Sequence, residues 1–113
     1  MNAATHPRII LKRILFLLKP MGNITIKYEA GAQGIYKDKV LFCLVDKGNI
    51  YLNADIEGPY FYYKELRLPF RKVRNIDAIL RPNAKPSDID KFLQYAIQSY
   101  WVMAGLKWID VIV

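Results

Sequence analysis

A run of six apolar residues, Val40–Val45, lies between two short polar turns, and this arrangement constrains the fold more than any other feature. The turns are residues 37–39 and residues 46–49, and the second contains a glycine that can adopt a positive φ angle. A continuous apolar run between turns is typical of a strand covered on both faces. Ile50–Ala54 is predicted as the returning strand, and Ile24–Tyr28, which alternates and is β-branched, as an earlier one. The sequence therefore predicts an antiparallel β-meander.

Two amphipathic helices are predicted, one before and one after the meander. The first begins at Pro7, a favoured first helical residue, and ends before Gly22. The last has Ser87 as its N-cap, with Asp90 three residues later in a capping-box-like pattern, and is stopped by Gly105. The apolar faces are Ile10, Leu11, Ile14, Leu15, Leu17 and Leu18 in the first helix, and Ile89, Phe92, Leu93, Ala96, Ile97, Tyr100, Trp101 and Ala104 in the last.

The order of helix, meander and helix predicts an α+β fold in which an antiparallel β-meander sheet packs against an N-terminal and a C-terminal helix. A length of 113 residues with 53% hydrophobic residues suits one core, so a single domain is expected over residues 1–113. Residues 1–6 are expected to be frayed. Residues 108–113 form an apolar tail that fits an added edge strand, a cover over the core, or a surface for a partner.

Between the meander and the last helix the pattern is less decisive. Tyr60–Tyr63 fits either a strand or a short helix. Leu68–Phe70 is interpreted as a loop and Arg71–Ile76 as a further strand. Earlier in the chain, Gly31–Gly34 is interpreted as a bulge or a tight turn between β segments.

The residue types that catalysis and metal binding require are scarce. With one cysteine and one histidine, far apart in the sequence, neither an internal disulfide nor a zinc site is predicted. Cys43 lies within the apolar run and is predicted to be part of the core. Ser87 and Ser99 are the only serines, and no nucleophile, base and orienting group stand in a catalytic pattern. We therefore expect neither enzyme activity nor a cofactor.

The charge balance points to an anionic partner. The formal net charge is +7, from 17 basic and 10 acidic residues, which favours binding to polyanions or acidic proteins. Basic residues beside aromatic ones suit phosphate contacts with base stacking, and such a cluster follows Tyr60–Tyr63. The predicted nucleic-acid-binding residues are Lys64, Arg67, Arg71, Lys72 and Arg74. The alternative interpretation is that the aromatic residues fill the core and the cations form a solvated face.

The first helix offers a second basic strip, made of Arg8, Lys12, Arg13 and Lys19. A basic amphipathic helix can lie on a membrane, but the aliphatic face of this helix is needed to cover the sheet. The apolar stretch Ile9–Leu18 is interrupted by charge and is shorter than the roughly 20 residues that span a bilayer. We therefore expect no membrane partner and a cytoplasmic location.

Residues 34–55 resemble the N-terminal domain of the TfoX/Sxy family of competence regulators. The shared pattern is a glycine, an apolar pair, a polar turn, an apolar strand, a glycine-containing turn and a strand with adjacent tyrosine and leucine. Its matching positions are Phe42, Leu44, Val45, Gly48, Tyr51, Leu52 and Asp55. Leu68–Phe70 is similar to a family loop, and Asp90–Ala104 is similar to the family's last helix. The resemblance covers residues 10–106.

This resemblance implies both a fold and a role. Members of the family are positive regulators of DNA-uptake genes, alongside the cyclic-AMP receptor protein at certain promoters, and the family supplies no catalytic residues. The expectation is thus a regulatory module that contacts DNA and the cyclic-AMP receptor protein. A second copy of the chain is a separate candidate partner. The alternative is a protein-interaction domain without nucleic-acid contact that dimerises through the apolar tail or a sheet edge.

Overall fold

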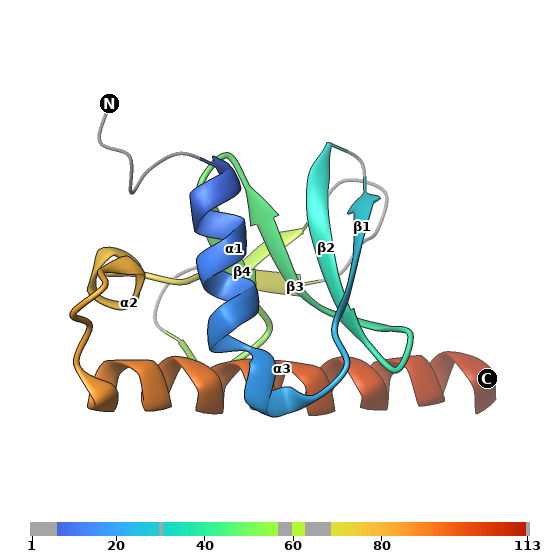
Figure 1. Ribbon diagram of the computed structural model, residues 1–113. Helices are drawn as coiled ribbons and strands as arrows, with labels where there is room; N and C mark the ends of the chain where they lie inside the picture. The colour runs from blue at the N-terminus through green and yellow to red at the C-terminus, as the bar shows by residue number, and fades with distance from the viewer. Residues whose placement is uncertain (1–6, 30, 57–59, 63–68, 113) are drawn as a thin grey trace.

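The computed structural model describes residues 7–29, 31–56, 60–62 and 69–112. It contains one six-stranded antiparallel sheet in the order β1-β2-β3-β4-β6-β5, with helices before and after it (Figure 1). The α+β prediction is confirmed. The elements are α1 (Pro7–Leu17), the 3₁₀ helix η2 (Lys19–Met21), β1 (Thr25–Glu29), β2 (Ala32–Lys37), β3 (Val40–Asp46), β4 (Asn49–Leu52), β5 (Tyr60–Tyr62), β6 (Pro69–Lys72), α2 (Asp77–Leu80) and α3 (Pro86–Ile112).

Two tight turns define the meander, at the positions that the sequence predicts. Asp38 and Lys39, between β2 and β3, have φ angles of 50° and 65°. Lys47 and Gly48, between β3 and β4, have φ angles of 50° and 80°. Two consecutive positive φ angles are the signature of type I′ turns, whose twist matches that of the paired strands. The central strand β3 is buried along Val40–Val45, as expected for a strand covered on both faces.

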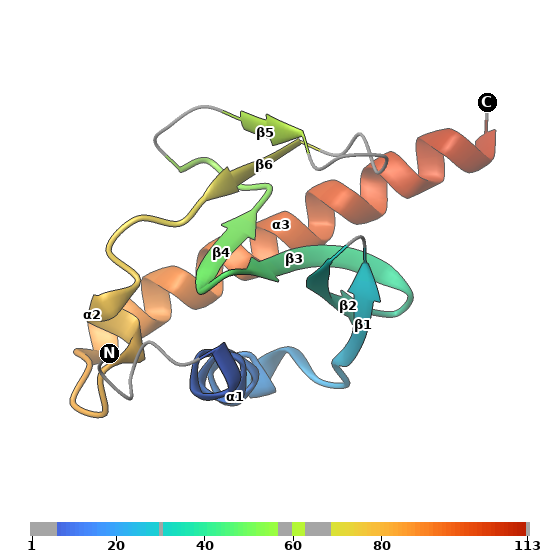
Figure 2. The same cartoon turned by 90° about the horizontal axis from the view of Figure 1, so that it is seen from above.

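The core has two parts, and α3 contributes to both. The larger cluster joins α1, the sheet, α2 and the first half of α3, and includes Ile14, Leu18, Cys43, Leu52 and Phe92. The smaller cluster lies between the sheet and the second half of α3 and consists of Val40, Leu41, Leu44, Phe70 and Met103. Figure 2 shows α1 beside the sheet and α3 running across it and on past its edge. The long last helix therefore spans the whole hydrophobic core.

The boundaries of α3 differ from the prediction. The helix begins at Pro86, so Ser87 lies inside its first turn and is not the N-cap. It continues through Gly105 to Ile112, and Gly105 is not among the glycines with positive φ. A single glycine costs a helix about 1 kcal/mol, which the neighbouring good helix formers outweigh. The apolar tail is thus helical up to Ile112 and is not an edge strand, while Val113 lies outside the described residues.

The buried face of α3 also differs from the prediction in part. Phe92 and Ala96 are buried as expected, but Ile97 is 39% exposed and Trp101 is 67% exposed. Ser99 and Met103 are buried in their place. The apolar residues of α3 are spread over all sides of the helix, so the hydrophobic pattern alone could not predict which side faces the core.

The segment after the meander contains two strands, β5 and β6, and the bounds of β6 differ from the predicted strand Arg71–Ile76. Pro69 and Phe70 belong to β6 and not to a loop, and the strand ends at Lys72. Phe70 is fully buried, which explains why this short segment stays on the sheet. Tyr60–Tyr62 is the edge strand β5, which decides between the two alternatives for that segment.

The segment Gly31–Gly34 differs from the prediction in part, because residues 32–34 belong to β2 and pair with β1, and so form neither a turn nor a bulge. Gly31, with a φ of 91°, lies next to β2, and Gly34 is buried within β2 opposite Leu44. The irregularity in the pairing of β2 with β3 falls at Ile35 and Tyr36, next to the glycines and not on them.

Candidate nucleic-acid interface

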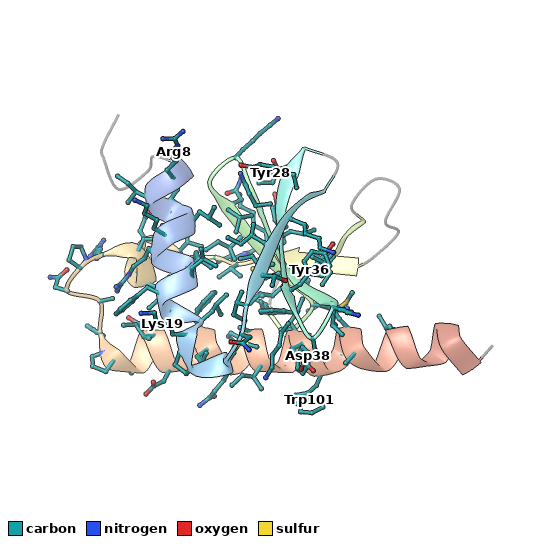
Figure 3. All side chains as sticks on the ribbon, turned by 45° about the vertical axis from the view of Figure 1, so that its right-hand side comes forward. Arg8, Lys19, Tyr28, Tyr36, Asp38 and Trp101 are labelled. Carbon is teal, nitrogen blue, oxygen red and sulfur yellow. The ribbon has the colours of Figure 1, made fainter. Side chains whose placement is uncertain are left out.

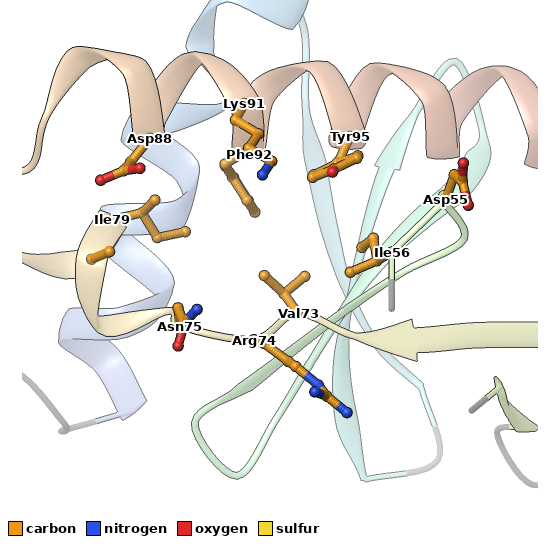
Figure 4. A pocket seen from close by; sticks show the side chains of 11 residues that line it. Asp55, Ile56, Val73, Arg74, Asn75, Ile79, Asp88, Lys91, Phe92 and Tyr95 are labelled. Atoms are coloured by element: carbon orange, nitrogen blue, oxygen red, sulfur yellow. The ribbon is translucent and has the colours of Figure 1, made fainter. Parts of the chain in front are cut away.

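Two of the predicted nucleic-acid-binding residues stand exposed on one side of β6 and the segment after it. Lys72 ends β6 opposite Tyr51 of β4, and Arg74 follows two residues later. Between them, the Val73 amide donates a 2.8 Å hydrogen bond to the Ile50 carbonyl, and its side chain packs against the larger core cluster. Figure 4 shows Val73 directed toward α3 and Arg74 directed away from it. The strand-like alternation therefore turns Lys72 and Arg74 to the same, outward side.

The other three predicted residues have different placements. Arg71 is partly buried, and its guanidinium donates a hydrogen bond to the Ile56 carbonyl. This contact ties β6 to the segment after β4, so Arg71 has a structural task. Lys64 and Arg67 lie outside the described residues, as does Tyr63. Of the five predicted residues, the structure therefore places Lys72 and Arg74 on the same outward side.

The second basic strip, on α1 and η2, is only partly available to a ligand. Arg13 donates hydrogen bonds to the carbonyls of Ile79 at 3.1 Å and of Arg81 at 3.2 Å, at the end of α2. A cation at the end of a helix satisfies carbonyl groups that lack partners within that helix. Arg13 and Lys19 also lie 5.6 Å from the centre of the Phe16 ring. Arg13 thus holds α2 against α1.

A pocket of about 340 Å³ lies between the first half of α3 and the segment that carries Arg74 (Figure 4). Its lining is Asp55, Ile56, Val73, Arg74, Asn75, Ala78, Ile79, Asp88, Lys91, Phe92 and Tyr95. Among these described lining residues two are acidic and two are basic, and none is a histidine, cysteine or serine. Within the described residues, no group of three or more His, Cys, Asp or Glu side chains could hold a metal ion.

A buried serine fastens α3 to the sheet, and sequence reasoning missed it. The Ser99 hydroxyl donates to the Phe42 carbonyl at 2.6 Å and accepts a 2.8 Å hydrogen bond from the Asn53 amide. The Asn53 side-chain amide in turn donates to the Met103 sulfur at 3.5 Å. A serine flanked by apolar residues carries no sequence signal for such a role, because the carbonyl and amide it serves are distant in the chain.

The lone cysteine belongs to the core, as predicted. Cys43 is fully buried in β3 and forms no disulfide. Burial raises the pKa of the Cys43 thiol far above its ordinary value, so the thiol stays protonated at neutral pH. Only the thiolate is a good nucleophile, and Cys43 therefore has a packing role.

Among the described residues, none of the helices is both long and apolar enough to span a bilayer. No family model, no curated protein and no solved structure matches this chain.

Proposed function

We propose that this chain is a cytoplasmic regulatory module, similar to the N-terminal domain of TfoX, that promotes transcription of DNA-uptake genes. It acts by contacting DNA and a protein partner of the kind of the cyclic-AMP receptor protein. The proposal assigns it no reaction and no cofactor. The observation that supports it best is the pair of outward-facing cations, Lys72 and Arg74, on a chain with a net charge of +7.

Both cations are suited to phosphate groups. Within the described part of the chain, neither the Lys72 side chain nor the Arg74 side chain makes a hydrogen bond or an ion pair. Both are fixed in direction, because the ladder between β4 and β6 and the inward packing of Val73 hold the backbone. Cations that replace condensed counterions supply most of the affinity of a protein for DNA of any sequence.

Reversing these two charges is expected to weaken DNA binding strongly. The Lys72→Glu/Arg74→Glu variant should bind a competence-promoter duplex at least about tenfold more weakly than the wild type, since charge-assisted contacts contribute about 1.5–3 kcal/mol each. Fluorescence anisotropy of labelled DNA measures the difference. The matched control is Lys47→Glu/Lys85→Glu, which changes the net charge by the same amount at two exposed positions elsewhere.

The control separates a local interface from a general charge effect. Equal weakening in both double variants would contradict an interface at Lys72 and Arg74. The same titrations with the cyclic-AMP receptor protein present test the protein contact. Binding only in its presence would favour the alternative of a protein-interaction domain that does not itself touch DNA.

A further inference from the structure

Between residues 92 and 106, the outward side of α3 carries a stripe of exposed, uncharged residues. Phe92, Ala96, Ser99 and Met103 point into the core, and the opposite side of the helix is exposed. The exposed stripe consists of Gln94, Gln98, Trp101 and Gly105, flanked by Ile97 and Val102. Figure 3 shows Trp101 projecting from α3 away from the sheet.

The absence of charge narrows the choice of partner. Residues 92–106 include no Asp, Glu, Lys or Arg, although 24% of the whole chain is charged. A surface without cations does not attract phosphates, so this face does not suit DNA. Two copies of a chain with a net charge of +7 repel each other, and an uncharged face is where they approach at the lowest electrostatic cost.

The spacing along the stripe is self-complementary. Gln94, Gln98, Trp101 and Gly105 follow one another at intervals of four, three and four residues, which is the repeat of helices that pair side by side. Because α3 extends to Ile112, positions 108 and 112 continue the same intervals on the helix backbone. Positions 94 and 112, 98 and 108, and 101 and 105 are each equidistant from position 103. Such a stripe meets a copy of itself in an antiparallel, two-fold arrangement.

In this arrangement the large side chain of Trp101 faces Gly105, which has no side chain. Position 101 of one copy lies opposite position 105 of the other, where an added Cβ would meet no atom within 4 Å in the monomer. Trp101 is already oriented, because its ring packs edge-on against Tyr100 at 5.2 Å. Tyr100 in turn donates a 3.0 Å hydrogen bond to Asp38. A side chain held in its bound position loses little entropy on association.

We propose that two copies of the chain associate through the outward faces of their α3 helices, antiparallel, with Trp101 of each copy seated on Gly105 of the other. This surface is separate from Lys72 and Arg74, so the proposal does not depend on DNA binding. It also differs from pairing through the sheet edge at β1, where Tyr28 is 81% exposed (Figure 3).

Sedimentation equilibrium of the full chain over a wide dilution series tests the proposal. The wild type is expected to dimerise, and Trp101→Lys and Gly105→Lys are each expected to weaken the dimer at least about tenfold. Gly105→Lys is the more informative variant, because a helix tolerates lysine better than glycine and the monomer should melt no lower than the wild type. Phe16→Lys on α1 and Tyr28→Lys on β1 are controls that change other exposed aromatic residues and should leave the dimer intact.

The outcomes are distinct. A wild type that stays monomeric overturns the proposal, as does a dimer that survives both α3 variants or is lost in Tyr28→Lys. Added salt should leave the dimer unchanged or strengthen it by screening the repulsion between copies, whereas it should weaken DNA binding. Failure of the dimer and failure of DNA binding can therefore be told apart in the same protein.

Discussion

Ser99→Ala is expected to lower the free energy of unfolding by about 2–4 kcal/mol, because it leaves two buried backbone groups without their hydrogen-bond partner. The Phe42 carbonyl and the Asn53 amide both depend on the Ser99 hydroxyl, at 2.6 Å and 2.8 Å. Ser99 itself is fully buried, so water does not take the place of the lost group. Urea denaturation followed by circular dichroism measures the change.

The control for this variant is the chain's other serine. Ser87 is exposed in the first turn of α3, and Ser87→Ala should change the free energy of unfolding by less than about 0.5 kcal/mol. Equal losses in the two variants would contradict the role of Ser99 in fastening α3 to the sheet.

Phe70→Ala is expected to lower the free energy of unfolding by about 3–5 kcal/mol, as for other aromatic residues removed from a core. Phe70 in β6 is fully buried and packs with Leu44 and Met103 in the smaller cluster. Its loss should also loosen β6, the strand that positions Lys72. Thermal and urea unfolding measure the first effect, and DNA anisotropy measures the second.

Phe16→Ala serves as the matched control, because Phe16 is 58% exposed on α1. It should change the free energy of unfolding by less than about 1 kcal/mol. If Phe70→Ala were no more harmful than Phe16→Ala, β6 would not be anchored in the way described.

The meander could be predicted because its signals are local. Six apolar residues between two turns determine β3, and the turns require only a few residues that accept positive φ angles. The start of α1 at Pro7 is equally local. Where neighbours in the sequence are also neighbours in space, the pattern predicted the structure correctly.

The orientation of α3 and the extent of β6 could not be predicted, since both depend on distant contacts. The exposed Trp101 and the buried Ser99 reverse what hydrophobicity alone indicates. Ser99 is buried because it serves groups on β3 and after β4, which lie 57 and 46 residues away in the chain. Phe70 likewise follows a proline in a loop-like sequence and is held in β6 by tertiary packing.

The candidate site could be predicted only as a cluster of charges. The sequence cannot distinguish Arg71, which hydrogen-bonds the Ile56 carbonyl, from Lys72 and Arg74, which face outward. That distinction depends on the alternation of side chains along β6 and on where the chain passes after β4. The same limit applies to Arg13, whose partners at the end of α2 lie more than sixty residues away.

The salt dependence of DNA binding by the wild-type chain tests the central claim, that exposed cations around Lys72 and Arg74 bind phosphates. Anisotropy titrations at a series of salt concentrations give the slope of log association constant against log salt. Each phosphate neutralised contributes about −0.9 to this slope, so two cations predict about −2 or steeper. Failure to bind at low salt, or a slope near zero, would contradict the claim.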